Sequence, residues 1–418
     1  MNPRSERMTS HPQTLKHSRQ VLDFIQSHET RLLEFTRDLV ATPSPTPPGD
    51  ERAVAARIVS ELEKLNLGKP EVIAGKPERP NLLVRLRTGR AGRSLILNGH
   101  IDTKPAGELA RWKTPPFEPV IHKGNLYGLG STDMKGAVAA MVYATAALAT
   151  VRPAWAGELQ LLLTADEEGG SSWGVKYLAE QGHLKADAAL IGEPSGIRRE
   201  LESVDLDSRG LLCVRFRVHG DQMHSSLSDE FKAVNASVKA AELILNFKKH
   251  FQRPGMTVNA GVTLQGGVYF GVVPGTAEFG CDVRVPVGTR EATLRTEVED
   301  WLRDCRRKDG DLRAEAVWET PPSIWIAPVH FPTDHPLASS LVEACRFILP
   351  EPPALGCFPG ATDAPWFVAA GIPTIPAFGP GLLPLAHSPN ECVRVASIFE
   401  CSRIYALCAL GYLADPRA

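Results

Sequence analysis

The sequence predicts an α/β protein, with a main domain built on a mixed sheet and a smaller α+β domain inserted into it. Three observations carry this prediction. Short apolar runs of strand length alternate with helical patterns in the first and last parts of the chain. One such run, residues 159–163, is followed closely by Asp166, Glu167 and Glu168 and then by two glycines. After Ser208, apolar and polar residues alternate, as in a strand with one solvated face.

The composition is that of a globular protein with two domains. Its 418 residues exceed the usual size of one domain, and 43% hydrophobic and 22% charged residues are ordinary values. A formal net charge of -2 gives no electrostatic reason to expect binding to nucleic acid or to an anionic membrane. The eight cysteines include no CxxC pair, so we expect reduced thiols and a cytoplasmic protein.

The chain begins with an extension that leads into helices. Residues 1–20 are polar and basic, without the apolar segment of a secretory signal, and we interpret them as an extension. Helical periodicity follows at 21–40, and Asp50 caps a second helix. After two strand-like runs comes an Ala-rich helix at 136–151, which is too short to cross a bilayer.

The inserted domain shows the element order β-α-β-β-α-β. A half-buried strand around residues 212–218 is followed by a helix, two strands, a second helix and a last strand near 312–318. This order is typical of a ferredoxin-like fold. We therefore expect an extension (1–20), a main domain of residues 21–205 and 320–418, and an inserted domain at 206–319.

The acidic triplet after residues 159–163 is the first candidate for chemistry. Like charges this close repel one another, and at the end of a buried strand they are also partly desolvated. In a surface loop, the ordinary interpretation would be a solvated acidic turn. In open α/β sheets, however, ligands collect at strand ends, and a bound cation would turn the repulsion into an attraction.

Further residues with metal-binding side chains follow strand ends or lie in adjoining loops: His100, Asp133, Glu193 and His387. Each alone has an ordinary structural explanation, such as a turn, a helix cap or a hydrogen-bonded histidine. Together with the acidic triplet they form a set of imidazoles and carboxylates without cysteine. Such a set suits Zn²⁺, with Co²⁺ or Mn²⁺ as alternatives.

Short motifs around these residues are spread along nearly the whole chain after the extension. They lie at residues 99–102, 128–136, 164–170, 192–194, 209–210, 220–225, 282–284, 360–363 and 386–387. Their sequences and order resemble the M20 family of metallopeptidases and deacylases, which includes acetylornithine deacetylase, succinyl-diaminopimelate desuccinylase and glutamate carboxypeptidase. The resemblance implies a zinc-aminopeptidase-like catalytic domain with two divalent metal ions, and an inserted lid and dimerisation domain.

The resemblance also implies a metal-binding role for five residues. His100 and Glu193 would bind one ion, Glu168 and His387 would bind the other, and Asp133 would bridge the two. Two ions about 3.5–4 Å apart can share a water molecule and lower its pKa towards ~7.

Three further residues would take part in catalysis. Glu167, beside the ligand Glu168, would be the general base that takes a proton from the water and returns it to the leaving amine. Asp102 would orient the imidazole of His100. His224 lies in the inserted domain, and in a homodimer joined through the lids it would reach the partner's site and stabilise the oxyanion. Without the resemblance, His224 would be interpreted as a surface histidine.

Substrate recognition is the least determined part of the resemblance. Arg209 and Arg284 match positions that hold a substrate carboxylate in relatives, and Thr362 would add a hydrogen bond to the substrate. Two positions depart from the family pattern. Lys104 stands where the family often has Val, and Gly271 stands where it often has an Asn that contacts the substrate. These departures argue against assigning the substrate of the desuccinylases to this chain. They do not affect the residues expected to bind metal.

We therefore expect a metal-dependent hydrolase that cleaves an amide bond of an N-acyl amino acid or a related small molecule bearing a carboxylate. One alternative is a dipeptidase or carboxypeptidase of the same fold, or a hydrolase that releases an aromatic amine. Another is an inactive relative that serves as a binding protein. The complete ligand set and Glu167 argue against an inactive protein, because such relatives lose at least one of these groups.

Overall fold

The structure, a computed structural model, describes residues 12–318 and 325–414. The chain forms two compact units. The first comprises the chain up to Asp207, His330–Phe358 and the chain from Thr362 onward, and the second comprises Ser208–Val329 with Pro359–Ala361. The predicted return to the main domain, at residues 319 and 320, lies outside the described residues.

The first unit is built on a six-stranded mixed sheet. Its strands are Glu71–Ile73 (β1), Asn81–Arg87 (β2), Ser94–His100 (β3), Glu158–Thr164 (β6), Ala188–Ile191 (β7) and Thr374–Ile375 (β16). They are arranged in the order β1-β2-β6-β3-β7-β16, and β3 runs parallel to both β6 and β7. Because parallel strands end at the same edge of a sheet, the segments that follow β3, β6 and β7 lie close together.

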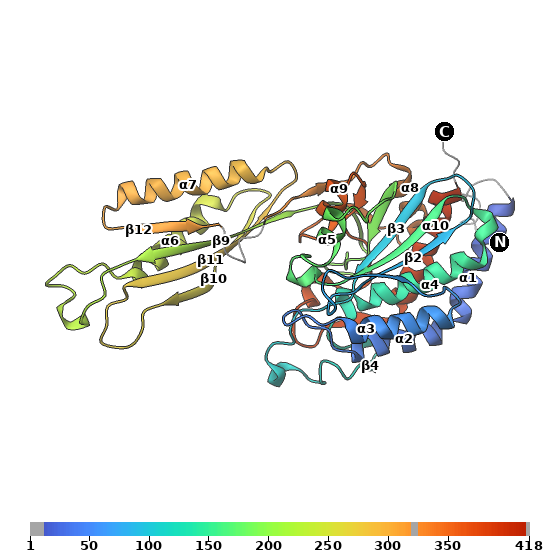
Figure 1. Cartoon of the computed structure of the whole chain (residues 1–418), viewed down its shortest axis with the longest axis horizontal. Coiled ribbons are helices and arrows are strands. Elements are labelled where there is room, and N and C mark those ends of the chain that lie inside the picture. Colours follow the sequence, from blue (N-terminus) through green and yellow to red (C-terminus); the bar gives the residue numbers. More distant parts are fainter. Residues whose placement is uncertain (1–11, 319–324, 415–418) are drawn as a thin grey trace. The chain divides into compact units, whose positions relative to one another are not determined.

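Helices pack around this sheet, and Figure 1 shows the first four of them gathered in one region of the unit. The longer helices are Pro12–Ser27 (α1), Glu29–Ala41 (α2), Arg52–Lys64 (α3), Gly136–Thr150 (α4), Pro336–Ile348 (α8) and Val395–Ala414 (α10). The helix α4 has no charged residue and is buried along almost its whole length. It contacts α1, α2 and α10 as well as β3 and β6, so it forms the centre of the main core.

The N-terminal helix begins earlier than predicted. Helix α1 starts at Pro12, inside the predicted extension, and it is separated near His28 from α2, where the sequence predicted one continuous helix. Val21 and Ile25 of α1 are fully buried in the main core. These two residues anchor the C-terminal half of α1 in that core. Residues 1–11 of the predicted extension lie outside the described residues.

Shorter elements complete the first unit. They are the helices Val175–Glu180 (α5) and Ala364–Ala369 (α9), and the strands Val120–His122 (β4), Asn125–Tyr127 (β5), Ser203–Ser208 (β8), Val329–His330 (β14), Ala354–Phe358 (β15) and Cys392–Arg394 (β17). One end residue of β8, Ser208, and one of β14, Val329, belong to the second unit. The strands form two small sheets, in the orders β17-β5-β4 and β14-β8-β15. Within residues 12–318 and 325–414, no helix has both the length and the apolar character needed to cross a membrane.

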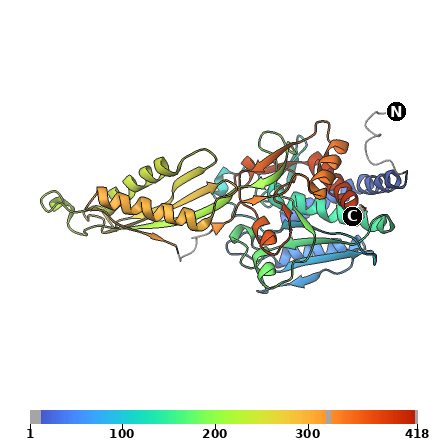
Figure 2. The ribbon, with the colours of Figure 1, turned by 90° about the horizontal axis from the view of Figure 1, so that it is seen from above.

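The second unit has the predicted order β-α-β-β-α-β. Its elements are Gly210–His219 (β9), Ala236–Phe251 (α6), Thr257–Gly266 (β10), Thr276–Val285 (β11), Glu291–Lys308 (α7) and Arg313–Val317 (β12), with Trp325–Ile326 (β13) pairing with β9. The antiparallel sheet has the order β10-β11-β9-β12. Phe216, on the buried face of β9, contacts Phe247 of α6 and Trp301 of α7. Both helices therefore cover the same face of the sheet, along which they run in Figure 2.

Candidate dinuclear metal centre

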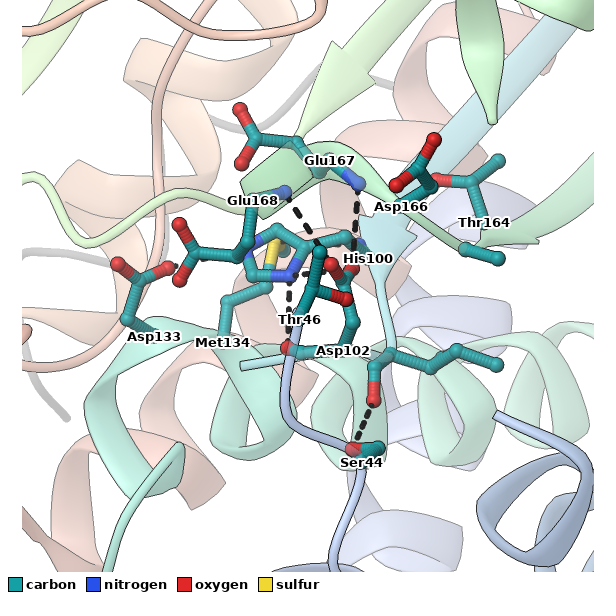
Figure 3. Close-up of polar contacts among 12 residues, drawn as sticks. Ser44, Thr46, His100, Asp102, Asp133, Met134, Thr164, Asp166, Glu167 and Glu168 are labelled. Atoms are coloured by element: carbon teal, nitrogen blue, oxygen red, sulfur yellow. Dashed lines mark hydrogen bonds and ion pairs between the residues drawn. The ribbon is translucent and has the colours of Figure 1, made fainter. Parts of the chain in front are cut away.

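The predicted metal ligands come together at the edge of the sheet where β3, β6 and β7 end. His100 is the last residue of β3, Glu168 lies in a short turn after β6, and Glu193 comes two residues after β7. Asp133 comes from the irregular segment before α4, and His387 from the loop that follows the turn Leu383–Leu385. Figure 3 shows the side chains of His100, Asp133 and Glu168 directed towards one another.

These five side chains form two groups of three that share Asp133. In the first group, the His100 Nε2 atom lies 2.9 Å from Asp133 Oδ1 and 3.8 Å from Glu193 Oε1. In the second, the His387 Nε2 atom lies 3.1 Å from Asp133 Oδ2 and 3.0 Å from Glu168 Oε1. Within each group, one ligand atom per residue lies within 4.8 Å of the others. Each oxygen of Asp133 therefore faces a different group, as a bridging ligand requires.

The chemistry of these groups fits divalent cations. Burial, followed by the negative charge of Asp133, raises the pKa of Glu193 well above its usual value. Burial also opposes ionisation of Asp133, but hydrogen bonds from His100 and His387 outweigh it and lower the pKa of this carboxyl. Several carboxylates thus share a desolvated site with two imidazoles, and their repulsion would be relieved by cations. Nitrogen and carboxylate ligands without sulfur fit Zn²⁺ and related ions.

Comparison with known proteins agrees with this geometry. A sequence model described as Peptidase family M20/M25/M40 matches residues 96–410. The chain is 30% identical over 393 residues to the succinyl-diaminopimelate desuccinylase of Methylobacillus flagellatus, and the match covers 90% of this chain and 98% of that protein. The chain belongs to the M20 family. It is therefore a metal-dependent hydrolase that acts on amide bonds.

Two further known proteins match nearly the whole chain as well. The N-formyl-4-amino-5-aminomethyl-2-methylpyrimidine deformylase of Halalkalibacterium halodurans is 28% identical over 431 residues, covering 94% of this chain and 97% of that protein. The crystal structure of the YXEP protein of Bacillus subtilis, described as a dinuclear metal-binding peptidase, superposes with a TM-score of 0.65 at 17% identity. The superposition covers 93% of this chain and 99% of that chain, and it shows that the two proteins share a fold.

Asp102 supports the M20 centre in two ways. Its backbone carbonyl accepts a hydrogen bond from His100 Nδ1 at 3.0 Å, and its Oδ1 atom lies 3.5 Å from the same nitrogen. Its carboxylate also accepts hydrogen bonds from the backbone N–H groups of Glu167 and Glu168, each at 3.2 Å (Figure 3). One residue thus fixes both the first histidine ligand and the acidic turn. The second function was not predicted from the sequence.

Glu167 differs from its neighbour Glu168 in its surroundings. Figure 3 shows the carboxylate of Glu168 beside Asp133, whereas the carboxylate of Glu167 points elsewhere. Glu167 belongs to neither group of candidate ligands among the described residues. Burial raises the pKa of Glu167 well above its usual value, His100 opposes this shift, and Asp363 and Glu168 add to it. A raised pKa suits a group that accepts and then donates a proton, but the assignment of Glu167 as the base stays a prediction.

The contacts that two residues make with the candidate metal ligands or their segments were not predicted from the sequence. Glu391 is buried, and its carboxylate accepts hydrogen bonds from the backbone N–H groups of Gly130, Thr132 and Asp133 at 3.0, 2.8 and 3.0 Å. It therefore holds the segment that carries the shared ligand. Burial, followed by the charge of Asp133, raises the pKa of Glu391 to about 8. The only sequence signal was its position four residues after a predicted ligand.

Lys104 is the second of these residues. Its Nζ atom lies 3.1 Å from Glu168 Oε2, and it also donates a hydrogen bond to the backbone carbonyl of Glu168. Burial lowers the pKa of Lys104, but the charges of Glu168 and Glu167 outweigh burial and the pKa is raised. The sequence analysis noted this lysine only as a departure from the family pattern.

The remaining predicted residues lie outside the two metal-binding groups. In the second unit, His224 is exposed and its Nδ1 atom accepts a hydrogen bond from the backbone of Ser226. Arg209 donates to Thr257 Oγ1 at 2.9 Å, and Arg284 forms a bidentate pair with Asp282 at 3.0 and 3.1 Å. In the first unit, Thr362 is buried and its Oγ1 atom accepts a hydrogen bond from the backbone of Ala364. Roles of these residues in catalysis or substrate binding stay predictions.

Proposed function

We propose that the protein hydrolyses the amide bond of an N-acyl amino acid or a related small molecule that bears a carboxylate. The observation that carries this proposal is the pair of histidine and carboxylate groups that share Asp133, with Glu167 next to them but outside both. Two divalent ions, Zn²⁺ or alternatively Co²⁺ or Mn²⁺, would supply a water molecule of lowered pKa and polarise the scissile carbonyl. His100, Glu193, Asp133, Glu168 and His387 would hold them.

The residues of the chain then have distinct tasks. Glu167 takes the proton of the attacking water on its carboxylate and delivers it to the nitrogen of the leaving amine. Asp102 keeps Glu167 in place through the backbone N–H of that residue, and it orients His100 through Nδ1. His224 donates a hydrogen bond to the developing oxyanion. This histidine lies in the second unit, and we propose that it acts on the site of the other subunit of a homodimer.

Contacts within the second unit bear on the class of substrate. The guanidinium of Arg284 is already paired with Asp282, whereas Arg209 forms no ion pair among the described residues. Of the two arginines, Arg209 is therefore the better candidate for holding a substrate carboxylate.

A second candidate function, hydrolysis of an amide that releases an aromatic amine, is favoured by the segment next to His224. The carbonyl of Gly271 accepts a hydrogen bond from the backbone N–H of Ser225. This bond holds the segment around Gly271 next to the segment of His224. Gly271 provides no side-chain amide, and the two residues before it, Tyr269 and Phe270, are 81% and 92% exposed. Apolar rings there would suit an aromatic amine better than a second carboxylate. The related pyrimidine deformylase has such a substrate in its name.

Exposed apolar residues of the second unit support a homodimer. Val238 and Leu245 of α6 are 52% and 72% exposed, and Val262 and Leu264 of β10 are 48% and 58% exposed. The strand β10 is at the edge of its sheet and contacts α6. An edge strand with exposed apolar residues beside an apolar helix surface is suited to pairing with a second copy of the chain. We propose that this surface is the dimer interface and that the protein is cytoplasmic, because its eight cysteines include no CxxC pair.

A substrate screen combined with one active-site variant tests the proposal. Chelator-treated protein is reloaded with Zn²⁺, Co²⁺ or Mn²⁺ and given N-acetyl, N-succinyl and N-formyl amino acids, dipeptides and an N-formyl aromatic amine, and the released amine is measured. Glu167→Gln should lower turnover of an accepted substrate by roughly 10²–10⁴-fold and keep both ions, because this residue transfers protons and binds no metal. Glu168→Gln is the matched control and should lose metal. If Glu167→Gln loses an ion, the two roles must be exchanged. If no amide is cleaved with any metal, the proposal fails.

A further inference from the structure

The two metal-binding groups differ in their surroundings. The side chains of His100, Asp133 and Glu193 in the first group are at most 7% exposed. No lysine or arginine within the described part of the chain forms an ion pair with these residues. In the second group, the side chain of His387 is 47% exposed and Glu168 is paired with the ammonium of Lys104.

Because of Lys104, the two carboxylate oxygens of Glu168 have different partners. The Oε1 atom lies 3.0 Å from His387 Nε2 and faces the second group, whereas Oε2 lies 3.1 Å from Lys104 Nζ. The same ammonium also donates to the backbone carbonyl of Glu168. Only Oε1 of this carboxylate is thus available to a cation, and the positive charge of Lys104 lies next to the other oxygen.

We propose that Lys104 makes the two metal sites unequal, by weakening the binding of a divalent cation to Asp133, Glu168 and His387 relative to the first group. This inference rests on the proposed dinuclear centre. Two effects act in the same direction. The ammonium repels a cation bound to the opposite oxygen of Glu168, and its hydrogen bond prevents that carboxylate from binding the cation with both oxygens.

A positioning role for Lys104 would act in the opposite direction, but Glu168 is already held by other contacts. Its backbone N–H donates to Asp102 Oδ2 at 3.2 Å, and its side chain is 4% exposed, so the surrounding protein confines it. Removing Lys104 should therefore leave the carboxylate near its present position. It should also free Oε2 and remove the positive charge.

The experiment measures metal affinity rather than activity. Full-length, chelator-treated protein is titrated with Zn²⁺ or Mn²⁺ in competition with a chromophoric chelator. The parent protein should bind a first ion tightly and a second ion more weakly. Lys104→Met should tighten the second binding step by about 10–100-fold, the usual size of an effect from a group behind a metal ligand, and leave the first step unchanged.

Matched variants separate the charge from other effects. Lys104→Arg keeps the positive charge and should retain the weak second step. Lys104→Gln removes the charge but keeps a hydrogen-bond donor for the carbonyl of Glu168. It should tighten the second binding step as Lys104→Met does, and it provides the test if the methionine variant folds poorly. Lys69→Met removes an exposed lysine that pairs with Glu63 instead, and it should change neither step.

The possible results lead to different conclusions. A second step that is unchanged or weaker in both uncharged variants overturns the inference and leaves the dinuclear centre intact. Two equally tight sites in the parent protein overturn it as well. If neither the parent nor the variants bind any divalent ion, the proposed metal centre itself is wrong.

Discussion

Replacing Glu391 with glutamine should weaken metal binding, because this carboxylate holds the segment that carries the shared ligand Asp133. Its Oε1 atom accepts the N–H groups of Thr132 and Asp133, and its Oε2 atom accepts that of Gly130. Glutamine has the same shape but only one acceptor oxygen. If that oxygen keeps the first two bonds, the amide NH₂ group must face the N–H of Gly130, so that two donors meet without an acceptor.

The size of the effect follows from these contacts. Above about pH 8, where Glu391 is ionised, loss of a buried hydrogen bond to this charged acceptor costs about 1.5–3 kcal/mol, and the unpaired donor adds to this cost. Glutamine carries no charge, however, and so escapes the desolvation that raises the pKa of Glu391 to about 8. We therefore expect a net cost of about 2 kcal/mol. If the cost falls entirely on metal binding, affinity should drop about 30-fold.

Competition with a chelator measures this change in chelator-treated protein. Glu202→Gln is the matched control, because the carboxylate of Glu202 also accepts three backbone N–H groups, those of Ile197, Arg198 and Arg199. None of these three residues is a candidate metal ligand. An unchanged metal affinity in Glu391→Gln would refute the reasoning. An equal loss in both variants would refute it too, since the effect would then be one of general stability.

Two further predictions concern the second unit and the pH dependence of stability. His224→Ala should lower kcat by roughly 10²–10³-fold without loss of metal, and mixed dimers with Glu167→Gln subunits should regain activity. Background activity in verified mixed dimers, or a monomer in light scattering, would exclude action across an interface. Burial raises the pKa of Asp205 to about 7 from 3.8, a shift opposed by Ser203 and aided by Glu202. This carboxyl is more readily protonated in the folded chain than in the unfolded chain. Its contribution to the free energy of unfolding is therefore complete below about pH 4, and it is lost as the pH rises through about 7. Asp205→Asn should therefore be more stable than the parent at pH 8, by at most about 4 kcal/mol, and the difference should shrink towards pH 4 in denaturant titrations. A pH-independent difference would contradict the assignment.

The fold of the second unit could be predicted because its signal is local. Residues of β9 alternate between buried and half-buried positions, and this period of two is visible in the sequence. The strand β8 was missed, since Asp205 and Asp207 interrupt its apolar pattern, and its partners β14 and β15 come more than a hundred residues later. The start of α1 at Pro12 was also missed, because residues 12–20 are mostly polar and show no apolar periodicity.

The grouping of the candidate metal ligands was predictable for a related reason. His100, Glu168 and Glu193 each come at or shortly after the end of a strand, so the sequence places them at one edge of a parallel sheet. Glu391 and Lys104 follow no such rule. Their function depends on which backbone N–H groups or carboxylate lie within reach, and this is decided only when loops far apart in sequence meet.

The acidic triplet shows how the fold resolves a repulsion that the sequence leaves open. Asp166 lies in the left-handed region with φ 64°, accepts the N–H of Trp173 at 3.0 Å and lies 3.4 Å from the guanidinium of Arg79, so its charge is used in structure. Glu168 faces both His387 and Lys104. The carboxylate of Glu167 belongs to neither metal-binding group, although the charges of Lys104 and His100 act on it, and its backbone N–H donates to Asp102 Oδ1. Two of the three charges are therefore neutralised by fixed partners. We predict that the third, Glu167, exchanges the proton, so its replacement should abolish turnover while the metal ions stay bound.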